Sequence, residues 1–188
     1  MANLTKPQRC NWCLTNSLYI DYHDNEWGKA CFDDQELFEK LSLESFQSGL
    51  NWLTILKKRN NFRAAFDQFD IQKIANYDSD KVEELLHNKG IVRHRGKIEA
   101  TINNAKASLI IKSEYDSLSH YFWRYVNHQP IVNNVPDLKS VASTSHLSKK
   151  ISKDLKIYGF KFLGPTTVYA FLQSCGIIND HLNKCFKK

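Results

Sequence analysis

The amino-acid sequence predicts an all-α protein built from many short helices. Apolar residues recur at helical spacing through most of the 188-residue chain, and no segment shows the clear alternation of apolar and polar residues that is typical of a strand. Only 7 Gly and 4 Pro interrupt the pattern, and there is no low-complexity tract or internal repeat. At this length we expect one domain over residues 1–188.

The first strong helical pattern covers residues 33–66. Its apolar side chains recur every three or four residues. Asp33 or Asp34 is suitably placed to cap the first turn. Gly49 lies inside the pattern and therefore predicts a break between two helices.

Shorter patterns follow in the middle of the chain. Residues 78–90 predict a helix that Ser79 caps and Gly90 closes. Residues 129–146 contain two prolines and many turn-forming residues, so we expect a loop there. Two more helices are expected, over residues 95–112 and 118–127.

The last pattern, residues 147–176, predicts a helix, a tight turn and a second helix. Gly164 ends the turn and Pro165 opens the next helix, where its missing N–H removes no helical hydrogen bond. Residues 149–175 resemble the helix-hairpin-helix DNA-binding element, whose hairpin amides hold the phosphate backbone. That element usually has two hairpin glycines, and Phe162 stands at the first of these positions here.

The chain carries an excess of positive charge, with 26 Lys and Arg against 20 Asp and Glu. A formal charge of +6 is compatible with nucleic acid, an acidic membrane or no particular partner. Three segments concentrate the excess: residues 57–63, 89–97 and 149–161. Each lies beside a glycine turn or a helix end, where free N–H groups bind phosphate. This favours phosphate binding over a set of merely solvated helix faces.

Nothing in the sequence indicates secretion or a membrane span. The first ten residues lack the apolar core of a secretory signal, and no apolar run approaches the roughly 20 residues that a span needs. We therefore expect a cytoplasmic protein that has no membrane partner. In that compartment the five cysteines are expected to be thiols or metal ligands rather than disulfides.

Two cysteines and two histidines near the chain ends form a candidate metal-binding set. His181 and Cys185 stand four residues apart, so on a helix they would share one face, and Cys10 and His23 lie at the other end of the chain. Two thiolates and two imidazoles match a tetrahedral structural Zn²⁺ site. From spacing alone, a packed or surface histidine and a solvated terminus are the more common interpretation of these residues.

Cys13 forms a C-x-x-C pair with Cys10, as in redox motifs and zinc knuckles. A zinc deaminase would need H-x-E and P-C-x-x-C, whereas Asp24 and Asn25 follow His23 and no Pro directly precedes Cys10. A thioredoxin-like site would need a βαβ setting, which the helical pattern does not provide. Both interpretations are therefore poor.

Long motifs in a fixed order carry a resemblance to a known family. They read RCNWC, LYIDYHDNEWG, LESFQSGLNWLTILKKR, GIVRHRGKIEATINNA, YVNHQP, YGFKFLGPTTVYAFLQSCG and NDHLNKC. Together they resemble bacterial 3-methyladenine DNA glycosylase I, the constitutive type within the helix-hairpin-helix glycosylase superfamily. The resemblance runs from about Arg9 to Cys185.

The resemblance implies an all-α helix-hairpin-helix glycosylase fold in which one structural zinc joins the segments 10–23 and 181–185. Cys13 has no ligand role in that pattern, and a monomer is expected. Carried over residue by residue, the implied zinc ligands are Cys10, His23, His181 and Cys185.

The resemblance also implies an activity, namely hydrolysis of the N-glycosidic bond of 3-methyladenine in alkylated double-stranded DNA. The products would be the free base and an abasic site. No lysine is marked as a Schiff-base nucleophile, so lyase activity is not expected.

The implied base pocket has Glu44 as its catalytic and base-binding carboxyl group. Its aromatic walls would be Trp12, Tyr19, Tyr22, Trp27 and Trp52. The implied DNA contacts are Gly49 and Leu50, which would fill the gap in the duplex, and Lys161 and Gly164 of the hairpin.

Some positions depart from the family pattern or have no assigned role. Ser48 and Asn51 stand where relatives commonly have Ala and Ser, which puts fine selectivity in doubt but not the activity. Asp180 is not assigned the superfamily's catalytic role. Roles stay open for three acids of the aromatic segment: Asp21, Asp24 and Glu26.

Two other functions are compatible with these features. A zinc-stabilised DNA-binding module would keep the hairpin and the basic segments but would have no catalytic pocket. A glycosylase for another lesion, such as 7-methylguanine or hypoxanthine, would differ in the base that it releases.

Overall fold

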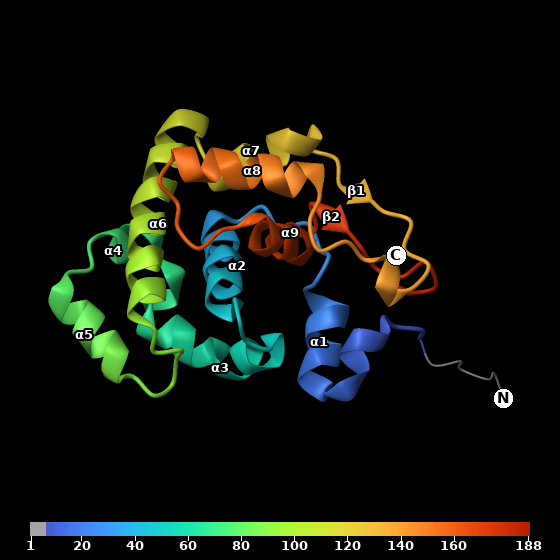
Figure 1. Ribbon diagram of the computed structural model, residues 1–188, viewed down its shortest axis with the longest axis horizontal. Coiled ribbons are helices and arrows are strands. Elements are labelled where there is room, and N and C mark those ends of the chain that lie inside the picture. Colours follow the sequence, from blue (N-terminus) through green and yellow to red (C-terminus); the bar gives the residue numbers. More distant parts are fainter. Residues whose placement is uncertain (1–6) are drawn as a thin grey trace.

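Helices dominate the computed structural model, which describes residues 7–188 (Figure 1). The predicted predominance of helix is thus confirmed. The α-helices are α1 (Ser17–Asn25), α2 (Asp34–Gln47), α3 (Trp52–Ala65), α4 (Ile71–Ala75), α5 (Ser79–His87), α6 (Arg95–Tyr115), α7 (Leu118–Trp123), α8 (His146–Ile157) and α9 (Pro165–Ser174). Short 3₁₀ helices are η1 (Asn11–Thr15), η2 (Asp67–Phe69), η3 (Arg124–Val126) and η4 (Leu138–Ser140). None of the helices in the described residues is both long and apolar enough to cross a membrane.

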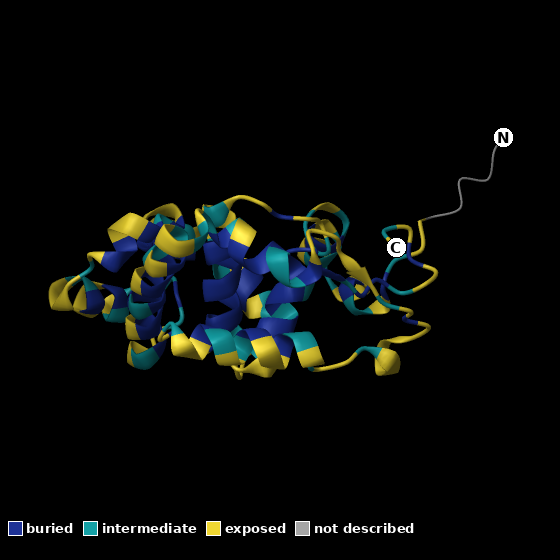
Figure 2. Cartoon of the chain, turned by 90° about the horizontal axis from the view of Figure 1, so that it is seen from above, coloured by how far each residue is buried: buried dark blue, intermediate teal, exposed yellow. Residues whose placement is uncertain are grey.

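Helix α2 forms the centre of the core. All of its residues from Leu37 to Phe46 are buried, and helices α3, α6, α7 and α9 pack against it. Figure 2 shows the buried residues concentrated along the middle of the molecule. Because α2 is enclosed on all sides, a polar side chain near its C-terminal end is held in a fixed, largely dry position.

The break at Gly49 is confirmed, and capping explains its place. Helix α2 begins where the side chain of Asp33 accepts a hydrogen bond from the Glu36 amide. It ends before Gly49, which has a φ of 82° in the left-handed region that favours glycine. Helix α3 then begins after Asn51, whose side chain accepts a hydrogen bond from the Leu53 amide.

The predicted cap and end of the helix in residues 78–90 are wrong. Asp78 is the N-cap, and its side chain accepts a hydrogen bond from the Lys81 amide, whereas Ser79 is already the first helical residue. The helix ends at His87, so Gly90 does not close it. Asp78 and Ser79 are adjacent and are both good N-cap residue types, so the sequence alone could not decide which of them caps the helix.

The expected loop over residues 129–146 contains two short elements. Strand β1 (Ile131–Val132) pairs in parallel with β2 (Ile178–Asn179), and 3₁₀ helix η4 follows within the loop. The expectation that no strand forms is therefore wrong here. Two residues are too few to show alternation, so this pair leaves no periodic signal in the sequence.

The predicted helix, turn and helix of residues 147–176 are present as α8 and α9. Gly164 is the extended N-cap of α9, and Pro165 occupies its first turn as expected. Phe162 has a φ of 59°, a left-handed conformation that glycine adopts more easily. The backbone thus keeps the turn that the usual glycine would make, although a phenylalanine stands there.

Gly176 joins α9 to β2 at a point where no other residue fits, and we expect Gly176→Ala to be strongly destabilising. Its φ is 73°, and a Cβ atom there would lie 2.4 Å from the carbonyl carbon of Lys29 and 2.6 Å from the Ala30 amide nitrogen. Strain and overpacking together should lower the free energy of unfolding by about 2–5 kcal/mol.

Gly159→Ala is the matched control for this prediction. Gly159 has a φ of 86°, but nothing lies within 4 Å of a Cβ atom built on it, so only the backbone strain of about 1–2 kcal/mol applies. Urea unfolding of both variants measures the difference. Equal losses of stability in the two variants would contradict the steric argument.

Candidate active site and metal centre

A cavity of about 390 Å³ opens beside the C-terminal end of α2. Its walls come from η1, α1, α2, the start of α3, the η4 region and α9. The volume suits a small planar ligand such as a nucleobase. The lining residues are Trp12, Tyr19, Tyr22, Trp27, Glu44, Gln47, Trp52, Leu138, Val141, Ala170, Gln173 and Asp180.

All six residues predicted to bind the base line this one cavity. The ring centroids of Trp12 and Trp27 lie 5.2 Å apart, and those of Tyr22 and Trp52 lie 5.5 Å apart. Trp52 also has a buried Nε1 group without a hydrogen-bond partner within residues 7–188. A buried polar group of this kind is costly, and a ligand with an acceptor at this point would satisfy it.

Glu44 is one of two buried acids that line the cavity, with Asp180 as the other, and only 5% of the Glu44 surface is exposed. Burial raises the pKa of its carboxyl group from 4.5 to about 8, while the charge of Lys40 acts in the opposite direction. The dominant cause is the loss of water around the charged form. With these neighbours the carboxyl group is therefore largely protonated near neutral pH.

This raised pKa predicts a pH-dependent difference in stability between the wild-type protein and Glu44→Gln. Above pH 4.5 the unfolded chain ionises Glu44, whereas the folded protein keeps it protonated until about pH 8. Between these two pH values the wild-type protein loses stability as the pH rises, whereas Glu44→Gln does not titrate at this position. The free energy of unfolding of Glu44→Gln relative to wild type should therefore increase by up to about 1.4 kcal/mol per pH unit across this window and level off above it. Urea unfolding of both proteins at several pH values measures the slope, and a constant difference would contradict the prediction.

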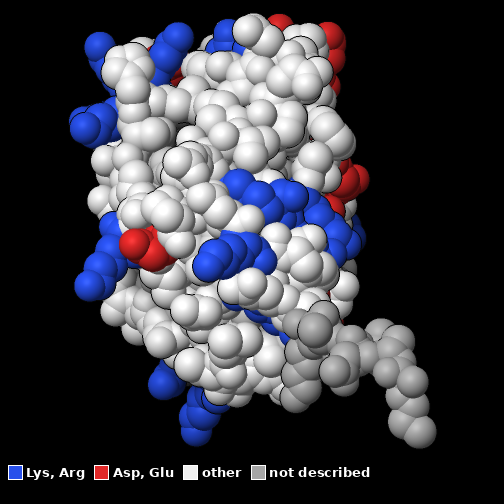
Figure 3. Space-filling view, turned by 90° about the vertical axis from the view of Figure 1, so that its right-hand side faces the viewer, with Lys and Arg blue, Asp and Glu red and all other residues white. Residues whose placement is uncertain are grey.

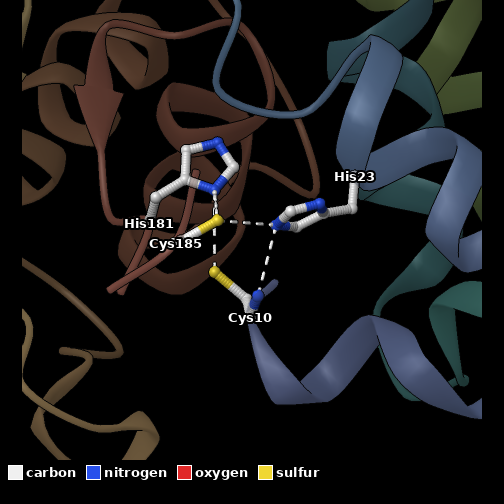
Figure 4. A group of neighbouring side chains, drawn as sticks. All are labelled: Cys10, His23, His181 and Cys185. Carbon is white, nitrogen blue, oxygen red and sulfur yellow. Dashed lines mark hydrogen bonds between the residues drawn. The ribbon is translucent and has the colours of Figure 1, made fainter. Parts of the chain in front are cut away.

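The structure brings together the four residues of the candidate metal-binding set, although they come from the two ends of the chain (Figure 4). All four are buried, and their ligand atoms lie within 4.8 Å of one another. The Sγ atom of Cys185 lies 3.4 Å from Nε2 of His23, and the Sγ atoms of both cysteines lie 3.6 Å from Nδ1 of His181. Zinc bond lengths of about 2.1 Å to nitrogen and 2.3 Å to sulfur in a tetrahedron require N to S separations of about 3.5 Å. The group therefore fits a tetrahedral ion in both residue type and spacing.

Neighbouring groups orient the two histidine rings. Nδ1 of His23 lies 2.7 Å from the carboxylate of Asp24, which Arg9 holds through hydrogen bonds of 2.7 to 3.0 Å. Arg9 lowers the pKa of that carboxyl group, so it stays ionised. Nε2 of His181 faces the carbonyl oxygen of Trp27 at 3.3 Å. Such contacts fix the ring nitrogens that face a metal, and they give Asp24 a role that the sequence left open.

One expectation about this group changes in the structure. His181 lies in irregular backbone and Cys185 in a bend, and neither is on a helix, so their proximity comes from the fold of the C-terminal segment rather than from helical spacing. Cys13 is buried, and its Sγ atom donates to the carbonyl oxygen of Cys10. It lies outside the four-residue group, in agreement with the absence of a ligand role.

The other two acids of the aromatic segment have different surroundings. Asp21 is exposed and accepts a hydrogen bond from Asn25. Glu26 is partly buried and pairs with Lys40 and Arg59. Burial alone would raise its pKa, but the two cations outweigh this and hold the pKa at about 2. Glu26 thus ties α1 to α2 and α3 beside the cavity.

The predicted DNA contacts occupy two exposed turns. Gly49 and Leu50 lie between α2 and α3, and the Leu50 side chain is 40% exposed. Lys161 and Gly164 lie exposed in the turn between α8 and α9. The backbone amide of Lys161 donates to Oδ1 of Asn104, so this amide is already engaged and only the side chain is free to meet a phosphate.

Several cations of the basic segments are engaged within the fold. Arg59 and Arg63 pair with Glu39, and Lys97 is buried. Arg59 and Lys97 are therefore not available for phosphate, whereas the paired side chain of Arg63 is still 36% exposed. Figure 3, which views the right-hand end of Figure 1, shows Lys and Arg side chains gathered across the middle of that face. A positive face of this kind favours an acidic partner.

Sequence reasoning missed six residues that line the cavity: Gln47, Leu138, Val141, Ala170, Gln173 and Asp180. Gln47 had a usable signal, because it follows Glu44 by three residues and so shares its helix face. Asp180 accepts hydrogen bonds from Asn133, Tyr169 and Gln173, which engage both of its oxygens. Its position depends on contacts between three segments, namely its own, α9 and the one that carries Asn133, which no local pattern reveals.

Comparisons with known proteins agree with this geometry. A family model described as methyladenine glycosylase matches residues 12–188. A DNA-3-methyladenine glycosylase of Haemophilus influenzae is 52% identical over 177 residues, which cover 94% of this chain and 96% of that protein. DNA-3-methyladenine glycosylase 1 of Escherichia coli is 46% identical over 178 residues, with 95% of each chain covered.

A solved structure gives the same result in three dimensions. The 3-methyladenine DNA glycosylase I of Staphylococcus aureus, solved to explain how it recognises 3-methyladenine, superposes with a TM-score of 0.93 at 39% identity and covers 96% of both chains. The resemblance found in the sequence motifs is therefore confirmed. The chain belongs to the methyladenine glycosylase family.

Proposed function

We propose that this protein is a DNA glycosylase that hydrolyses the N-glycosidic bond of 3-methyladenine in alkylated double-stranded DNA. The products are free 3-methyladenine and an abasic site. The observation that carries the proposal is a base-sized cavity with aromatic walls and a buried carboxyl group, Glu44, beside them. The relatives in H. influenzae and E. coli carry the name of this activity.

The chemistry explains why such a cavity is sufficient. Alkylation at N3 gives adenine in DNA a positive charge and weakens its glycosidic bond, so the base is already a good leaving group. The enzyme must extract the base and hold it, and flipping costs a few kcal/mol. Stacking returns about 1–3 kcal/mol per base, and a cation over an aromatic ring adds about 0.5–2 kcal/mol. Trp12 and Trp52 are the rings that we expect to supply these contacts.

Glu44 gives the cavity its preference for a charged base. A cationic base beside this buried carboxyl group favours the ionised form, which then accepts hydrogen bonds from the base edge. A neutral adenine offers no such compensation, and an ionised Glu44 beside it would remain a buried, unpaired charge. We therefore expect discrimination to depend on charge as well as on shape.

We further propose one structural Zn²⁺ held by Cys10, His23, His181 and Cys185. The spacing of their ligand atoms and the chemistry of the donor set support this. A site closed by four protein ligands has no open position for substrate or water, so its effect is on folding. Joining residues 10–23 to residues 181–185 would hold the aromatic wall of the cavity against the C-terminal segment.

For DNA binding we propose a helix-hairpin-helix element in residues 149–175. The left-handed backbone at Phe162 and the exposed Lys161 and Gly164 support it. Gly49 and Leu50 are proposed to fill the gap that the flipped base leaves. We also expect a cytoplasmic monomer with a single glycosylase domain.

Release of base from alkylated DNA tests the proposed function. The protein should liberate 3-methyladenine from methylated duplex DNA, with the product identified by chromatography, and leave the abasic strand uncut because no lyase step occurs. DNA binding without base release would instead indicate a non-catalytic module. Release of 7-methylguanine or hypoxanthine in its place would indicate a different lesion.

A further inference from the structure

Helix α6 contacts both of the turns that we propose to face DNA. Figure 1 shows α6 running beside the connection between α8 and α9, with α3 near its lower end. The first turn is residues 48–50, between α2 and α3, and the second is residues 159–164, between α8 and α9. The role of α6 in holding these two turns rests on the proposed function, because only a protein that acts on DNA needs both turns at once.

The first contact comes from Lys97 at the start of α6. Only 6% of this lysine is exposed, and its Nζ atom donates to the carbonyl oxygens of Phe46 at 2.8 Å and Ser48 at 2.7 Å. Within residues 7–188 no carboxylate forms an ion pair with it. Burial lowers the pKa of its ammonium group. A buried, unpaired cation is costly, so its place at the end of α2 depends on these carbonyl groups and on the negative end of the helix dipole.

Lys97 thereby fixes the backbone immediately before Gly49 and Leu50. Two further hydrogen bonds complete this turn: the Leu50 amide donates to the Gln47 carbonyl, and the Gln47 side chain donates to the Leu50 carbonyl, both at 2.6 Å. Gln47 also lines the cavity. The exposed Leu50 side chain is therefore presented by a turn that is hydrogen-bonded on both sides.

The second contact comes from two asparagines farther along α6. Asn104 donates to the carbonyl oxygen of Lys161 at 3.0 Å and accepts from its amide at 2.8 Å. Asn103 donates to the carbonyl oxygen of Gly159 at 2.6 Å. The hairpin is thus attached to α6 through its backbone, independently of the side chains that it exposes.

The two attachment points have a fixed separation. Lys97 and Asn104 are seven residues apart, which places them on one face of the helix about 10 Å apart along its axis. A continuous helix of 21 residues connects them, so neither turn can shift relative to the other without breaking a side-chain hydrogen bond. Two DNA-facing segments must keep a fixed distance if they contact the same duplex at the same time.

We propose that Lys97 and Asn104 are positioning residues that use α6 to fix the spacing between the turn at Gly49–Leu50 and the hairpin at Lys161–Gly164. They contact neither the base nor the DNA. Their effect is on how efficiently a base is extracted from duplex DNA, and not on how well the cavity holds a free base.

Lys97→Met tests this, because it keeps an unbranched side chain that is only one heavy atom shorter and removes the ammonium group. Single-turnover excision from methylated duplex DNA should fall by about tenfold or more, as expected when a charged donor to two carbonyl groups is lost. Binding of free 3-methyladenine, measured by tryptophan fluorescence, should change little. The matched control is Lys106→Met on the same helix, where the lysine is exposed and wild-type excision is expected.

A double-mutant cycle with Leu50→Ala separates positioning from general loss of structure. If Lys97 acts through this turn, Lys97→Met should have little further effect on excision once the Leu50 side chain is gone. Its full effect in the Leu50→Ala background would overturn the proposal. So would wild-type excision by Lys97→Met, or an equal loss of free-base binding and excision.

Asn104→Leu provides a second, independent test, for use also if Lys97→Met does not fold. It removes both hydrogen bonds to Lys161 while keeping the number and branching of the side-chain heavy atoms, and it should weaken duplex excision while leaving free-base binding unchanged. Unchanged excision in this variant would overturn the role of Asn104. Failure of the unmodified protein to release 3-methyladenine would instead refute the proposed function itself, so the two failures are distinguishable.

Discussion

Replacement of Glu44 by Gln should leave DNA binding close to the wild-type level and reduce the release of 3-methyladenine by about 100-fold or more. Glu44 is 5% exposed at the end of the buried helix α2, so the change removes a group that can ionise beside a bound cationic base and preserves the shape of the cavity. Only the ionised carboxyl group can oppose the charge of an alkylated base, and Gln remains neutral. The measurement is single-turnover release of labelled base together with DNA binding by the same preparation.

The Glu44→Gln result needs a control for the chemical change itself. Glu84 lies on α5 with 66% of its side chain exposed, and Glu84→Gln should retain wild-type excision. Release of 3-methyladenine by Glu44→Gln at the wild-type rate would remove Glu44 from its assigned role. Loss of DNA binding in that variant would show that its effect is not confined to the cavity.

Loss of the proposed zinc site should have the largest effect on stability. Cys185→Ser removes one of four buried ligands, and a structural zinc site contributes folding free energy directly, about 10–16 kcal/mol in small zinc-dependent domains. In this larger core we expect a loss of several kcal/mol, together with loss of bound zinc. At low temperature, where the variant is still folded, excision should change less than stability does.

Cys13→Ser is the matched control for the metal site. Cys13 is also buried in the N-terminal segment, but it lies outside the four-residue group, so this variant should keep its zinc. Elemental analysis and thermal unfolding, with and without a chelator, measure both effects. Less than about half an equivalent of zinc in wild-type protein purified without chelator would count against the site.

The sequence predicted well those elements whose structure is set by residues close together in the chain. The break at Gly49 and the start of α9 at Pro165 follow from the conformations that these residues prefer. The helical class follows from periodicity along each segment. The start of α5 was misplaced by one residue, because Asp78 and Ser79 are both good capping residues.

The candidate site was predictable where its residues share a motif or a distinctive chemical type. The aromatic residues and Glu44 lie in long motifs that resemble a known family, and all of them line one cavity. The Cys and His set stood out because few other residue types bind zinc. Its mutual distances could not be predicted, since residues 171 positions apart meet only in the folded chain.

By itself the sequence determined the helical class, the family and the residue types of the cavity and of the candidate metal-binding set, because these depend on local periodicity and on motifs. Only the tertiary structure decided that Lys97 is buried against α2, that Asp180 is enclosed by hydrogen bonds, and that His181 and Cys185 meet outside any helix. The physical reason is that burial and pairing are set by contacts between segments far apart in the chain. Any local pattern predicts that a lysine is an exposed surface cation. Only the packing of α6 against the end of α2 buries Lys97 and brings its ammonium group to the carbonyl oxygens there.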